Sequence, residues 1–266
     1  MRSVRFAADG RVRHGWAEGE GEGLVLRDES GRAFSPAQAV WLPPVEPGTI
    51  LAVALNYADH AAELALAQPE APALFLKPGH ALVGHKGSVV LPRGVRHLHY
   101  EGELAVVIGR PARRVRPSEA LEHVRGYTVA NDVTARDFVA DVFRPPTKAK
   151  GWDTFLPLGP WLVEGEIADP GRLAIRTLVN GEVRQEGTTA DMVVSVADLV
   201  AYTSEFLTLM PGDVLLTGTP RGISPVRPGD VIRVEIEGVG ALENRVVAEE
   251  DAGWAPPGGE GGTRRG

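Results

Sequence analysis

The stretch His99-Tyr100-Glu101-Gly102-Glu103-Leu104-Ala105-Val106-Val107-Ile108-Gly109 places two glutamates directly before a run of apolar residues. The apolar run, with its β-branched members and the glycine that follows it, predicts a buried strand. Because successive side chains of a strand point to opposite faces, Glu101 and Glu103 are expected on the same side, roughly 6–7 Å apart at the backbone. Two carboxylates this close repel each other unless a cation lies between them or one takes up a proton. The stretch therefore indicates either a cation site or two solvated glutamates at an exposed strand start.

The composition is that of a globular protein, since the 266 residues are 43% hydrophobic and 24% charged. No apolar run approaches the roughly 20 residues of a membrane span, and the N-terminus lacks the apolar core of a signal peptide. We therefore expect a cytoplasmic protein with no membrane partner. The net charge of −7 argues against a nucleic-acid partner. Because the chain has no cysteine, disulfides, thiolate-bound zinc and thiol nucleophiles are excluded.

Glycine and proline divide the chain into three regions. Residues 1–45 alternate apolar and polar residues with many glycines, which predicts a small β-rich N-terminal module ending near Pro43-Pro44. Residues 46–250 are expected to form the main domain. The tail 251–266, rich in glycine, proline and arginine from Gly253 onward, is expected to be disordered.

Periodicity and turn signals place the elements of the main domain. We expect helices over 58–68, 117–124 and 195–209, strands over 49–55, 103–109, 126–132, 214–216 and 231–236, short strands and loops over 73–91, and a two-residue hairpin turn at Asn180-Gly181. Ser195 is expected to cap the last helix. Residues 140–152 show no periodicity, which predicts a loop long enough to be a lid. Many short strands with few helices indicate an α+β fold rather than alternating βαβ units.

Asp132 is the third candidate carboxylate, because it lies at the end of the predicted strand 126–132. If that strand neighbours the strand of Glu101 and Glu103, the three carboxylates converge. Three oxygen ligands without a thiol suit Mg²⁺ or Mn²⁺, with Ca²⁺ as a further option. Asn131-Asp132 could equally form only a turn.

His97 and His99 have the same parity as the two glutamates, so a His/His/Glu/Glu site for zinc or iron is an alternative. Alternation means little before His97, however, because Arg93-Gly94-Val95 is expected to be a loop. The two histidines could therefore lie on the surface instead.

His60 and Glu63 lie three residues apart on a predicted helix and therefore share a face. A carboxylate paired with an imidazole raises its basicity and orients it, as a general base requires. An ordinary surface pair is the alternative. Lys150 could donate to a developing oxyanion, or it could be a solvated loop lysine.

Two further residues could contact an acidic substrate. Thr219 belongs to Thr217-Gly218-Thr219-Pro220, where hydroxyls and backbone N–H groups could hold a carboxylate, or which could be a simple tight turn. Arg136 could form a bidentate pair with an acid, or it could bridge to Asp137 or another surface carboxylate.

Several segments, in this order, resemble the fumarylacetoacetate hydrolase superfamily. They are Leu55-Asn56-Tyr57-Ala58-Asp59-His60-Ala61-Ala62-Glu63, Phe75-Leu76-Lys77-Pro78, Tyr100-Glu101-Gly102-Glu103-Leu104-Ala105, Gly126-Tyr127-Thr128, Asn131-Asp132-Val133-Thr134-Ala135-Arg136-Asp137, Lys150 with Asp153 and Pro157-Leu158-Gly159-Pro160, and Leu216-Thr217-Gly218-Thr219-Pro220-Arg221-Gly222. The resemblance covers about residues 48–247. Within the superfamily, the chain is similar above all to the bacterial branch named for 2-hydroxyhepta-2,4-diene-1,7-dioate isomerase and the related 5-carboxymethyl-2-oxo-hex-3-ene-1,7-dioate decarboxylase.

The resemblance implies a role for each candidate residue. Glu101, Glu103 and Asp132 would hold Mg²⁺ or Mn²⁺, His60 with Glu63 would be the base and its orienting partner, and Lys150 would face the substrate oxygens. The substrate-binding residues that it implies are Asn56, Tyr57, Lys77, Arg136 and Thr219. The implied fold is a mixed β-sheet rolled on itself with flanking helices, and the implied assembly is a homodimer.

The chain departs from the family pattern in two places. Larger hydrolases of the family place a fourth acidic metal ligand upstream of the histidine, but Val53-Ala54-Leu55 is apolar here, so we predict three protein ligands. Some members that cleave acylpyruvates carry a glutamine three residues after the equivalent of Arg136, where this chain has Val139.

The activity that this resemblance implies is a metal-dependent isomerase/decarboxylase acting on a dicarboxylic 2-oxo or 2-hydroxy dienoate through a metal-stabilised enolate, in homoprotocatechuate catabolism. An acylpyruvate hydrolase or an oxaloacetate decarboxylase on the same scaffold is the alternative enzyme. A non-catalytic ligand-binding homologue is an alternative of another class, although binding a cation requires neither Lys150 nor His60.

Overall fold

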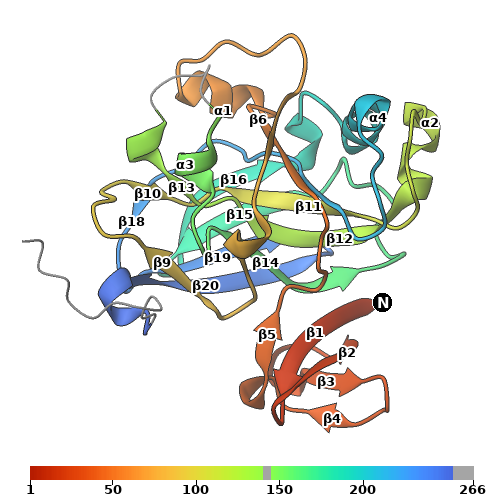
Figure 1. Ribbon diagram of the computed structural model, residues 1–266, viewed down its shortest axis with the longest axis vertical. Helices are drawn as coiled ribbons and strands as arrows, with labels where there is room; N and C mark the ends of the chain where they lie inside the picture. Colours follow the sequence, from red (N-terminus) through yellow and green to blue (C-terminus); the bar gives the residue numbers. More distant parts are fainter. Residues whose placement is uncertain (140–144, 254–266) are drawn as a thin grey trace, which may run out of the picture.

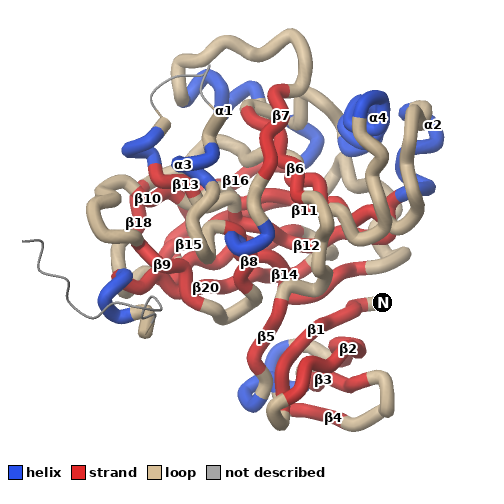
Figure 2. The backbone as a smooth tube through the Cα atoms, in the orientation of Figure 1, coloured by secondary structure: helices blue, strands red, loops and turns tan. Residues whose placement is uncertain are grey.

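A computed structural model of the chain describes residues 1–139 and 145–253. Strands dominate these residues, and the helices are short and lie around the sheets (Figure 1; Figure 2). The expected disorder of the tail after Gly253 and the first part of the expected lid, at 140–144, lie outside the described residues. The α+β class predicted from the sequence is confirmed.

The described residues form sheets of 12, 5 and 3 strands. The large sheet has the order β4 (Ala33–Phe34), β3 (Val25–Asp28), β2 (Arg11–Glu18), β1 (Arg2–Ala8), β14 (Leu156–Val163), β12 (Val124–Asn131), β11 (Gly102–Ile108), β17 (Val214–Leu216), β6 (Ile50–Ala54) and β7 (Ala73–Leu76), with β5 (Val40–Leu42) paired to β1 and β8 (Leu82–Val83) paired to β14. The second sheet has the order β16 (Glu182–Thr188), β15 (Ala174–Val179), β19 (Val231–Ile236), β20 (Gly240–Ala248) and β9 (Ser88–Leu91). The smallest sheet contains β13 (Thr134–Ala135), β10 (Leu98–His99) and β18 (Pro225–Val226). The α-helices are α1 (Ala58–Glu63), α2 (Pro117–Ala120), α3 (Thr147–Lys150) and α4 (Val196–Phe206).

Strand β11 lies in the interior of the large sheet, with β12 on one side and β17 on the other, both antiparallel. Its side chains alternate between two separate apolar cores. Leu104, Val106 and Ile108 pack in the larger core, which also contains residues of the second sheet. Ala105 and Val107 pack on the opposite face of the strand. Because both faces are covered, the sequence of β11 is a continuous apolar run rather than an alternating one.

The N-terminal module contains β1 to β5 and has an apolar core of its own. This core consists of Val4, Phe6, Ala8, Ala17, Leu26, Phe34 and Trp41. The module is not separate from the main sheet, because β1 pairs with β14 through Arg2 opposite Val163 and Ser3 opposite Leu162. Figure 1 shows the module as a lobe beside the larger body.

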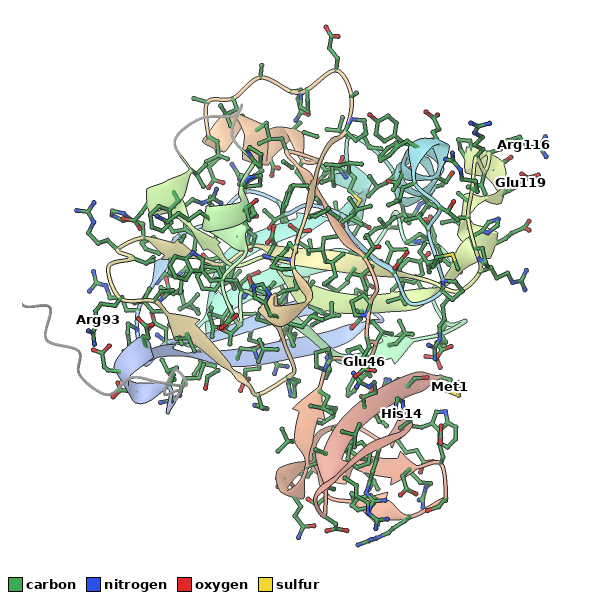
Figure 3. The ribbon with its side chains drawn as sticks, viewed as in Figure 1. Met1, His14, Glu46, Arg93, Arg116 and Glu119 are labelled. Atoms are coloured by element: carbon green, nitrogen blue, oxygen red, sulfur yellow. The ribbon has the colours of Figure 1, made fainter. Side chains whose placement is uncertain are left out.

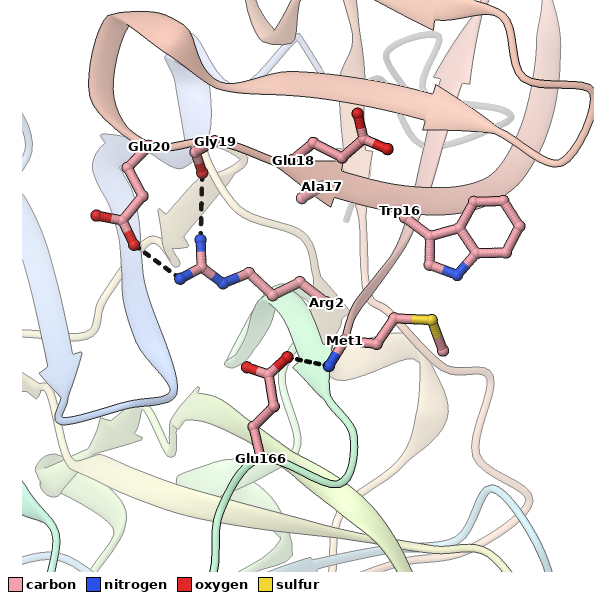
Figure 4. A pocket seen from close by; sticks show the side chains of 8 residues that line it. All are labelled: Met1, Arg2, Trp16, Ala17, Glu18, Gly19, Glu20 and Glu166. Carbon is pink, nitrogen blue, oxygen red and sulfur yellow. Dashed lines mark hydrogen bonds and ion pairs between the residues drawn. The ribbon is translucent and has the colours of Figure 1, made fainter.

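At the start of β1, the contact between Met1 and Glu166 joins the module to the larger body, whereas the contacts of Arg2 with Gly19 and Glu20 lie within the module. The amino group of Met1 forms an ion pair with Glu166, whereas Arg2 donates to the Gly19 carbonyl at 3.2 Å and to Glu20 at 2.8 Å (Figure 4). These residues line a surface depression of about 540 Å³. Figure 3 shows that Met1, His14 and Glu46 lie near this junction, whereas Arg93 and Arg116 lie on opposite sides of the larger body.

Three α-helices end earlier than the sequence predicts, and the one expected over 117–124 is α2, which ends at Ala120 and continues as a 3₁₀ turn over Leu121–His123. The predicted helix 58–68 is α1, which ends at Glu63 because Ala65 adopts a left-handed conformation with φ of 54°. The predicted helix to residue 209 is α4, which ends at Phe206 because Leu207 is extended, with φ of −117° and ψ of 132°. The predicted cap of α4 is confirmed, since the Ser195 hydroxyl accepts from the Asp198 N–H at 3.1 Å.

The hairpin turn at Asn180-Gly181 is confirmed between β15 and β16, with φ of 53° and 83° at its two residues. The predicted loop 140–152 is wrong at its end, because residues 147–150 form the single helical turn α3, which carries Lys150. The pattern there is too short to reveal a helix by periodicity. None of the helices in the described part of the chain has both the length and the hydrophobicity needed to cross a lipid bilayer.

Candidate metal and catalytic site

Glu101, Glu103 and Asp132, which we call the acidic triad, meet where β11 begins and β12 ends. One carboxylate oxygen from each lies within 4.8 Å of the others. All three residues are buried, since Glu101 is 5% exposed and Glu103 and Asp132 are each 1% exposed. The register explains this convergence, because Gly102 of β11 lies opposite Asn131 of β12. The segment that precedes Gly102 and the segment that follows Asn131 therefore lie side by side.

Local hydrogen bonds fix these two segments to each other. The Asp132 N–H donates to the Glu101 carbonyl at 2.8 Å, and the Glu101 N–H donates to the Asn131 side-chain oxygen at 2.9 Å. Asn131 is the last residue of β12 and Asp132 follows it directly, so the end of this strand brings a carboxylate to the triad. The structure brings the three predicted carboxylates together.

Gly102 separates the two glutamates because no larger residue fits there. A Cβ atom at this position would lie 2.4 Å from the Thr177 hydroxyl oxygen and 2.9 Å from a Val234 methyl group. Both of these residues belong to the second sheet, which packs directly on the start of β11. The glycine therefore allows close approach of the two sheets beneath the acidic triad.

Three basic side chains, Lys77, Lys150 and Arg136, surround the acidic triad, and we call them the cation set. Lys150 Nζ lies 2.8 Å from Glu101 Oε2, 2.5 Å from Asp132 Oδ2 and 2.9 Å from the Thr134 hydroxyl. Lys77 Nζ lies 2.6 Å from Asp132 Oδ1 and donates to the Lys150 carbonyl at 2.6 Å. Arg136 forms an ion pair with Oε1 of Glu101. The three carboxylates and the three cations balance in formal charge.

The two glutamates have opposite pKa shifts. Burial alone would raise the pKa of Glu101, but Lys150 and Arg136 hold it below its usual range. Burial raises the pKa of Glu103 well above its usual value, and the neighbouring charges of Asp132 and Glu101 raise it further. Glu103 is thus the member of the triad that lacks a cationic partner among the described residues; its Oε2 accepts from the Gly218 N–H at 2.7 Å.

The donor set of the acidic triad fits a hard divalent cation. Three buried carboxylates with no thiol are the ligands such ions prefer. A cation beside Glu103 would also relieve the repulsion that raises the pKa of this side chain. The triad could therefore hold one divalent ion, and the apolar stretch Val53-Ala54-Leu55 supplies no fourth carboxylate.

His60 and Glu63 form the predicted pair on α1. His60 is buried, and its Nδ1 lies 3.0 Å from Glu63 Oε2. The other oxygen of Glu63 accepts from the Gly222 N–H at 2.9 Å, which fixes the carboxylate on both sides. His60 is close enough to the acidic triad to lower the pKa of Glu101. The pair therefore combines a buried imidazole with a carboxylate that is 29% exposed at its side chain and that orients the ring.

Asn56 and Tyr57 precede α1 and differ in what they offer a ligand. Both amide hydrogens of Asn56 are engaged, with the Val194 carbonyl at 3.0 Å and the Thr217 carbonyl at 2.9 Å, and its oxygen accepts from the Val194 N–H at 2.8 Å. Asn56 thus joins three chain segments. Tyr57 is fully buried, and its hydroxyl finds no hydrogen-bond partner within the described residues. Burial, followed by the charge of Glu103, raises the pKa of this phenol, so it stays protonated and can donate.

The turn Thr217-Gly218-Thr219-Pro220 follows β17 and lies against the acidic triad through the bond between Gly218 and Glu103. Gly218 has φ of 88°, and a Cβ there would lie 2.9 Å from the Cβ of Asn56. The Thr219 hydroxyl is buried and accepts from Gln185 Nε2 at 2.9 Å.

The structure decides between the alternatives for the histidines and for Arg136. Among the described residues, the group of acidic and histidine side chains close enough to share a metal ion is the acidic triad, which includes neither His97 nor His99. The His97 ring lies 3.4 Å from Asp137 instead. Burial, followed by the charge of Arg136, lowers the pKa of His99 to about 4, so this ring is neutral. Arg136 pairs with Glu101, not with Asp137.

Sequence reasoning missed two polar residues of the site. The Thr134 hydroxyl accepts from Lys150 and lies 3.2 Å from Glu101 Oε1. Thr134 belongs to the segment Asn131-Asp132-Val133-Thr134-Ala135-Arg136-Asp137, and its position two residues after Asp132 could have indicated that it lies beside this carboxylate. Gln185 contacts both β11 and Thr219 from β16, and no local pattern in the sequence indicates these contacts.

Residues 49–247 match the family described as "Fumarylacetoacetate (FAA) hydrolase C-terminal". The chain belongs to this family. Among its relatives is the 4-hydroxyphenylacetate degradation bifunctional isomerase/decarboxylase of Salmonella dublin, which is 49% identical over 230 residues. That match covers 86% of this chain but 53% of the relative, so this chain spans about half the length of that protein.

Solved structures of two relatives align over nearly their whole length. The 5-carboxymethyl-2-hydroxymuconate delta-isomerase from Mycobacterium smegmatis is 42% identical, with a TM-score of 0.85, and the match covers 94% of this chain and 99% of that one. The 2-hydroxyhepta-2,4-diene-1,7-dioate isomerase from Mycobacterium marinum is 37% identical, with a TM-score of 0.84 and the same coverage.

Proposed function

We propose that this chain is a divalent-metal-dependent isomerase/decarboxylase of a dicarboxylic 2-oxo or 2-hydroxy dienoate, of the 2-hydroxyhepta-2,4-diene-1,7-dioate type, in homoprotocatechuate catabolism. The observation that carries the proposal is the buried acidic triad, balanced by the cation set and accompanied by the oriented His60–Glu63 pair. The names of the relatives support the substrate class. We assign the chemistry to the main domain, residues 46–250, rather than to the N-terminal module, residues 1–45.

In this proposal, Glu101, Glu103 and Asp132 hold Mg²⁺ or Mn²⁺, and Ca²⁺ would fit the same oxygen ligands. When bound, such an ion supplies positive charge that stabilises negative charge developing on the oxygens of a 2-oxo acid. The acidic triad offers three ligands, fewer than the six that Mg²⁺ takes, which leaves positions for substrate and water.

His60 acts as the proton carrier in this proposal. Its Nδ1 is held by Glu63 at 3.0 Å, so Nε2 is the atom that meets the substrate. During isomerisation, Nε2 takes a proton from one position of the conjugated acid and returns it to another, so the reaction needs no co-reactant. Glu63 stabilises the imidazolium that exists between the two transfers.

Lys150, Arg136 and two hydroxyl groups bind and orient the acid. Lys150 donates to the substrate oxygens, on which charge develops, and Arg136 pairs with a carboxylate. The protonated phenol of Tyr57 and the hydroxyl of Thr219 are further donors beside the triad. Lys77, whose side chain is completely buried against Asp132, holds this metal ligand in place. Asn56, which is bonded to Val194 and Thr217, joins the segments that surround the acid.

An acylpyruvate hydrolase or an oxaloacetate decarboxylase would use the same residues. Val139, where some acylpyruvate-cleaving members carry glutamine, favours the isomerase/decarboxylase. We also propose that the chain acts as a cytoplasmic homodimer, which the resemblance to the family supports. Light scattering after size-exclusion chromatography tests the assembly.

Turnover measurements on three substrates test the proposed activity. The purified chain is assayed with 2-hydroxyhepta-2,4-diene-1,7-dioate, an acylpyruvate and oxaloacetate, first with Mn²⁺ or Mg²⁺ and then after EDTA. We expect the dienoate to give the highest kcat/KM and EDTA to abolish it. Full activity in EDTA would reject the metal, preference for another acid would reject the substrate class, and binding without turnover would indicate a non-catalytic homologue.

A further inference from the structure

Gln185, in β16, connects Gly102, which lies between two members of the acidic triad, with Thr219 in the turn that follows β17. It is 1% exposed and makes four hydrogen bonds. Its Oε1 accepts from the Gly102 N–H at 3.1 Å and from the Thr177 hydroxyl at 2.8 Å. Its Nε2 donates to the Thr219 hydroxyl at 2.9 Å and to the Pro220 carbonyl at 2.7 Å. All four hydrogen-bonding positions of the amide are therefore filled.

The partners of Gln185 allow one orientation of its amide. The Gly102 N–H can only donate, so the atom facing it must be the oxygen. The Pro220 carbonyl can only accept, so the atom facing it must be the nitrogen. The bond to Thr219 therefore runs from the amide nitrogen to the hydroxyl oxygen, and Thr219 is the acceptor.

This direction determines what the Thr219 hydroxyl can do. A hydroxyl has one hydrogen to donate, and Gln185 offers Thr219 no acceptor for it. None of the hydrogen bonds within the described residues uses that hydrogen. Because Gly218, the preceding residue, donates to Glu103, the hydroxyl lies on the turn that borders the acidic triad. An acceptor at the site, such as a carboxylate, is the partner that this hydroxyl lacks.

We propose that Gln185 is a positioning residue that keeps the Thr219 hydroxyl as a donor to a carboxylate of the substrate. Gln185 thereby makes the site beside Thr219 suited to an anionic group, which accepts hydrogen bonds, and unsuited to a group that can only donate them. Through Gly102, the same amide also fixes the backbone between two members of the acidic triad. The inference rests on the proposed function, because it takes the bound acid as the ligand.

Exchanging Gln185 for glutamate tests the direction of the bond. In Gln185→Glu, the new carboxylate can still accept hydrogen bonds from Gly102 and Thr177 but cannot donate one. The Thr219 hydroxyl must then donate its hydrogen to this carboxylate, and it is no longer a donor to the substrate. We expect KM for the dienoate and the Kd of oxalate, measured calorimetrically with Mg²⁺ present, to rise about tenfold or more, with kcat changed less than threefold. A tenfold change corresponds to about 1.4 kcal/mol, the range of one hydrogen bond to a charged group.

Variants of Thr219 and Thr177 keep the test decisive if Gln185→Glu folds poorly. Thr219→Val should raise KM and the oxalate Kd like Gln185→Glu, and Thr219→Ser should restore both. Thr177→Val is the matched control, because it removes the other hydroxyl partner of Gln185 and should leave KM unchanged.

Two results would overturn the inference while the proposed function stands: unchanged KM and oxalate Kd in Thr219→Val, or an equal increase in Thr177→Val. A wild-type chain that neither binds oxalate nor turns over any of the three acids would reject the inference together with the proposed function.

Discussion

The Nζ atom of Lys150 lies 2.8 Å from Oε2 of Glu101, among the oxygens of the acidic triad. The same ammonium lies 2.5 Å from Oδ2 of Asp132, so it bridges two of the three carboxylates. A metal ion bound to the triad would share these oxygens with the ammonium. Lys150 therefore has two effects in the proposed function, because it donates to the substrate and also opposes the charge of the cation.

Replacing Lys150 by methionine separates these two effects. We expect Lys150→Met to bind Mn²⁺ about tenfold more tightly, because a positive charge leaves the ligands, and to lose about 10²-fold in kcat, because a donor to the oxyanion is lost. The free energy of unfolding of the metal-free variant should fall by about 3 kcal/mol, since two buried carboxylates lose a partner. Calorimetric titration, steady-state kinetics and urea unfolding measure these changes. Lys148→Met, on the exposed side of the same helix, is the control, and equal Mn²⁺ affinities in wild type and Lys150→Met would contradict the expectation.

Glu103→Gln tests the acidic triad as a metal site. Glutamine keeps the shape of the side chain and removes one of three repelling charges, so the metal-free variant should remain as stable as the wild type. Its Kd for Mn²⁺ should rise about 100-fold, equivalent to about 3 kcal/mol, because one of three carboxylate ligands is lost. Glu122→Gln, at an exposed position, should bind Mn²⁺ normally. If Glu103→Gln bound the ion as tightly as the wild type, the triad would not be the site.

The His60–Glu63 pair should affect turnover without affecting the metal. We expect His60→Ala to reduce kcat by about 10²–10⁴-fold, the range for loss of a general base, with an unchanged Kd for Mn²⁺. Glu63→Gln should reduce kcat less, because the imidazole remains but loses its orienting charge. His14→Ala, in the N-terminal module, serves as the control. A normal kcat in His60→Ala would remove this residue from the mechanism.

Gly102→Ala should destabilise the chain, because the added Cβ would lie 2.4 Å from the Thr177 hydroxyl. We expect a loss of about 2–3 kcal/mol in the free energy of unfolding, the range for overpacking, and weaker Mn²⁺ binding as the flanking glutamates move. Thr177→Ala in the same chain should recover part of both losses. Gly79→Ala is the control, because a Cβ there meets nothing within 4 Å. No loss in Gly102→Ala would show that the sheets can separate at this point without cost.

His85 should make the fold less stable in acid. Burial, followed by the charge of Lys86, lowers its pKa from 6.5 to about 4, and its Nδ1 accepts from the Glu243 N–H. Because the unfolded chain binds a proton near pH 6.5 and the folded chain only near pH 4, stability is lost as the pH falls between these values and is retained above them. His85→Asn keeps an acceptor without the titration, so its loss of stability between pH 7 and 4.5 should be smaller by about 2 kcal/mol. Urea unfolding at both pH values measures this difference, and identical losses in the two proteins would contradict it.

The sequence predicts β11 and the acidic triad well because their signals are local. The apolar run of β11 follows from burial on both faces, and the shared side of Glu101 and Glu103 follows from strand alternation. Predicting that Asp132 joins the two glutamates required one further assumption, namely that strands consecutive in the sequence also pair in the sheet. Strands β11 and β12 do pair.

The features that the sequence did not predict depend on distant residues or on unusual backbone conformations. The early end of α1 comes from Ala65, which adopts a left-handed conformation. Glycine is the residue that usually signals such a helix end, and this position has none. Gln185 lies 83 residues from Gly102 in the chain, and Asn56 lies 138 residues from Val194, so their contacts depend on the packing of whole sheets. A single sequence carries no periodic signal for such pairs.

The pairing of β1 with β14 has a consequence for shortening this chain. Without residues 1–45, the outer side of β14 would lose the two residue pairs with β1 that now cover it. Uncovered backbone groups on such a strand readily pair with a strand of another molecule. We therefore expect a fragment trimmed to the region matched by the family to self-associate more readily than the whole chain.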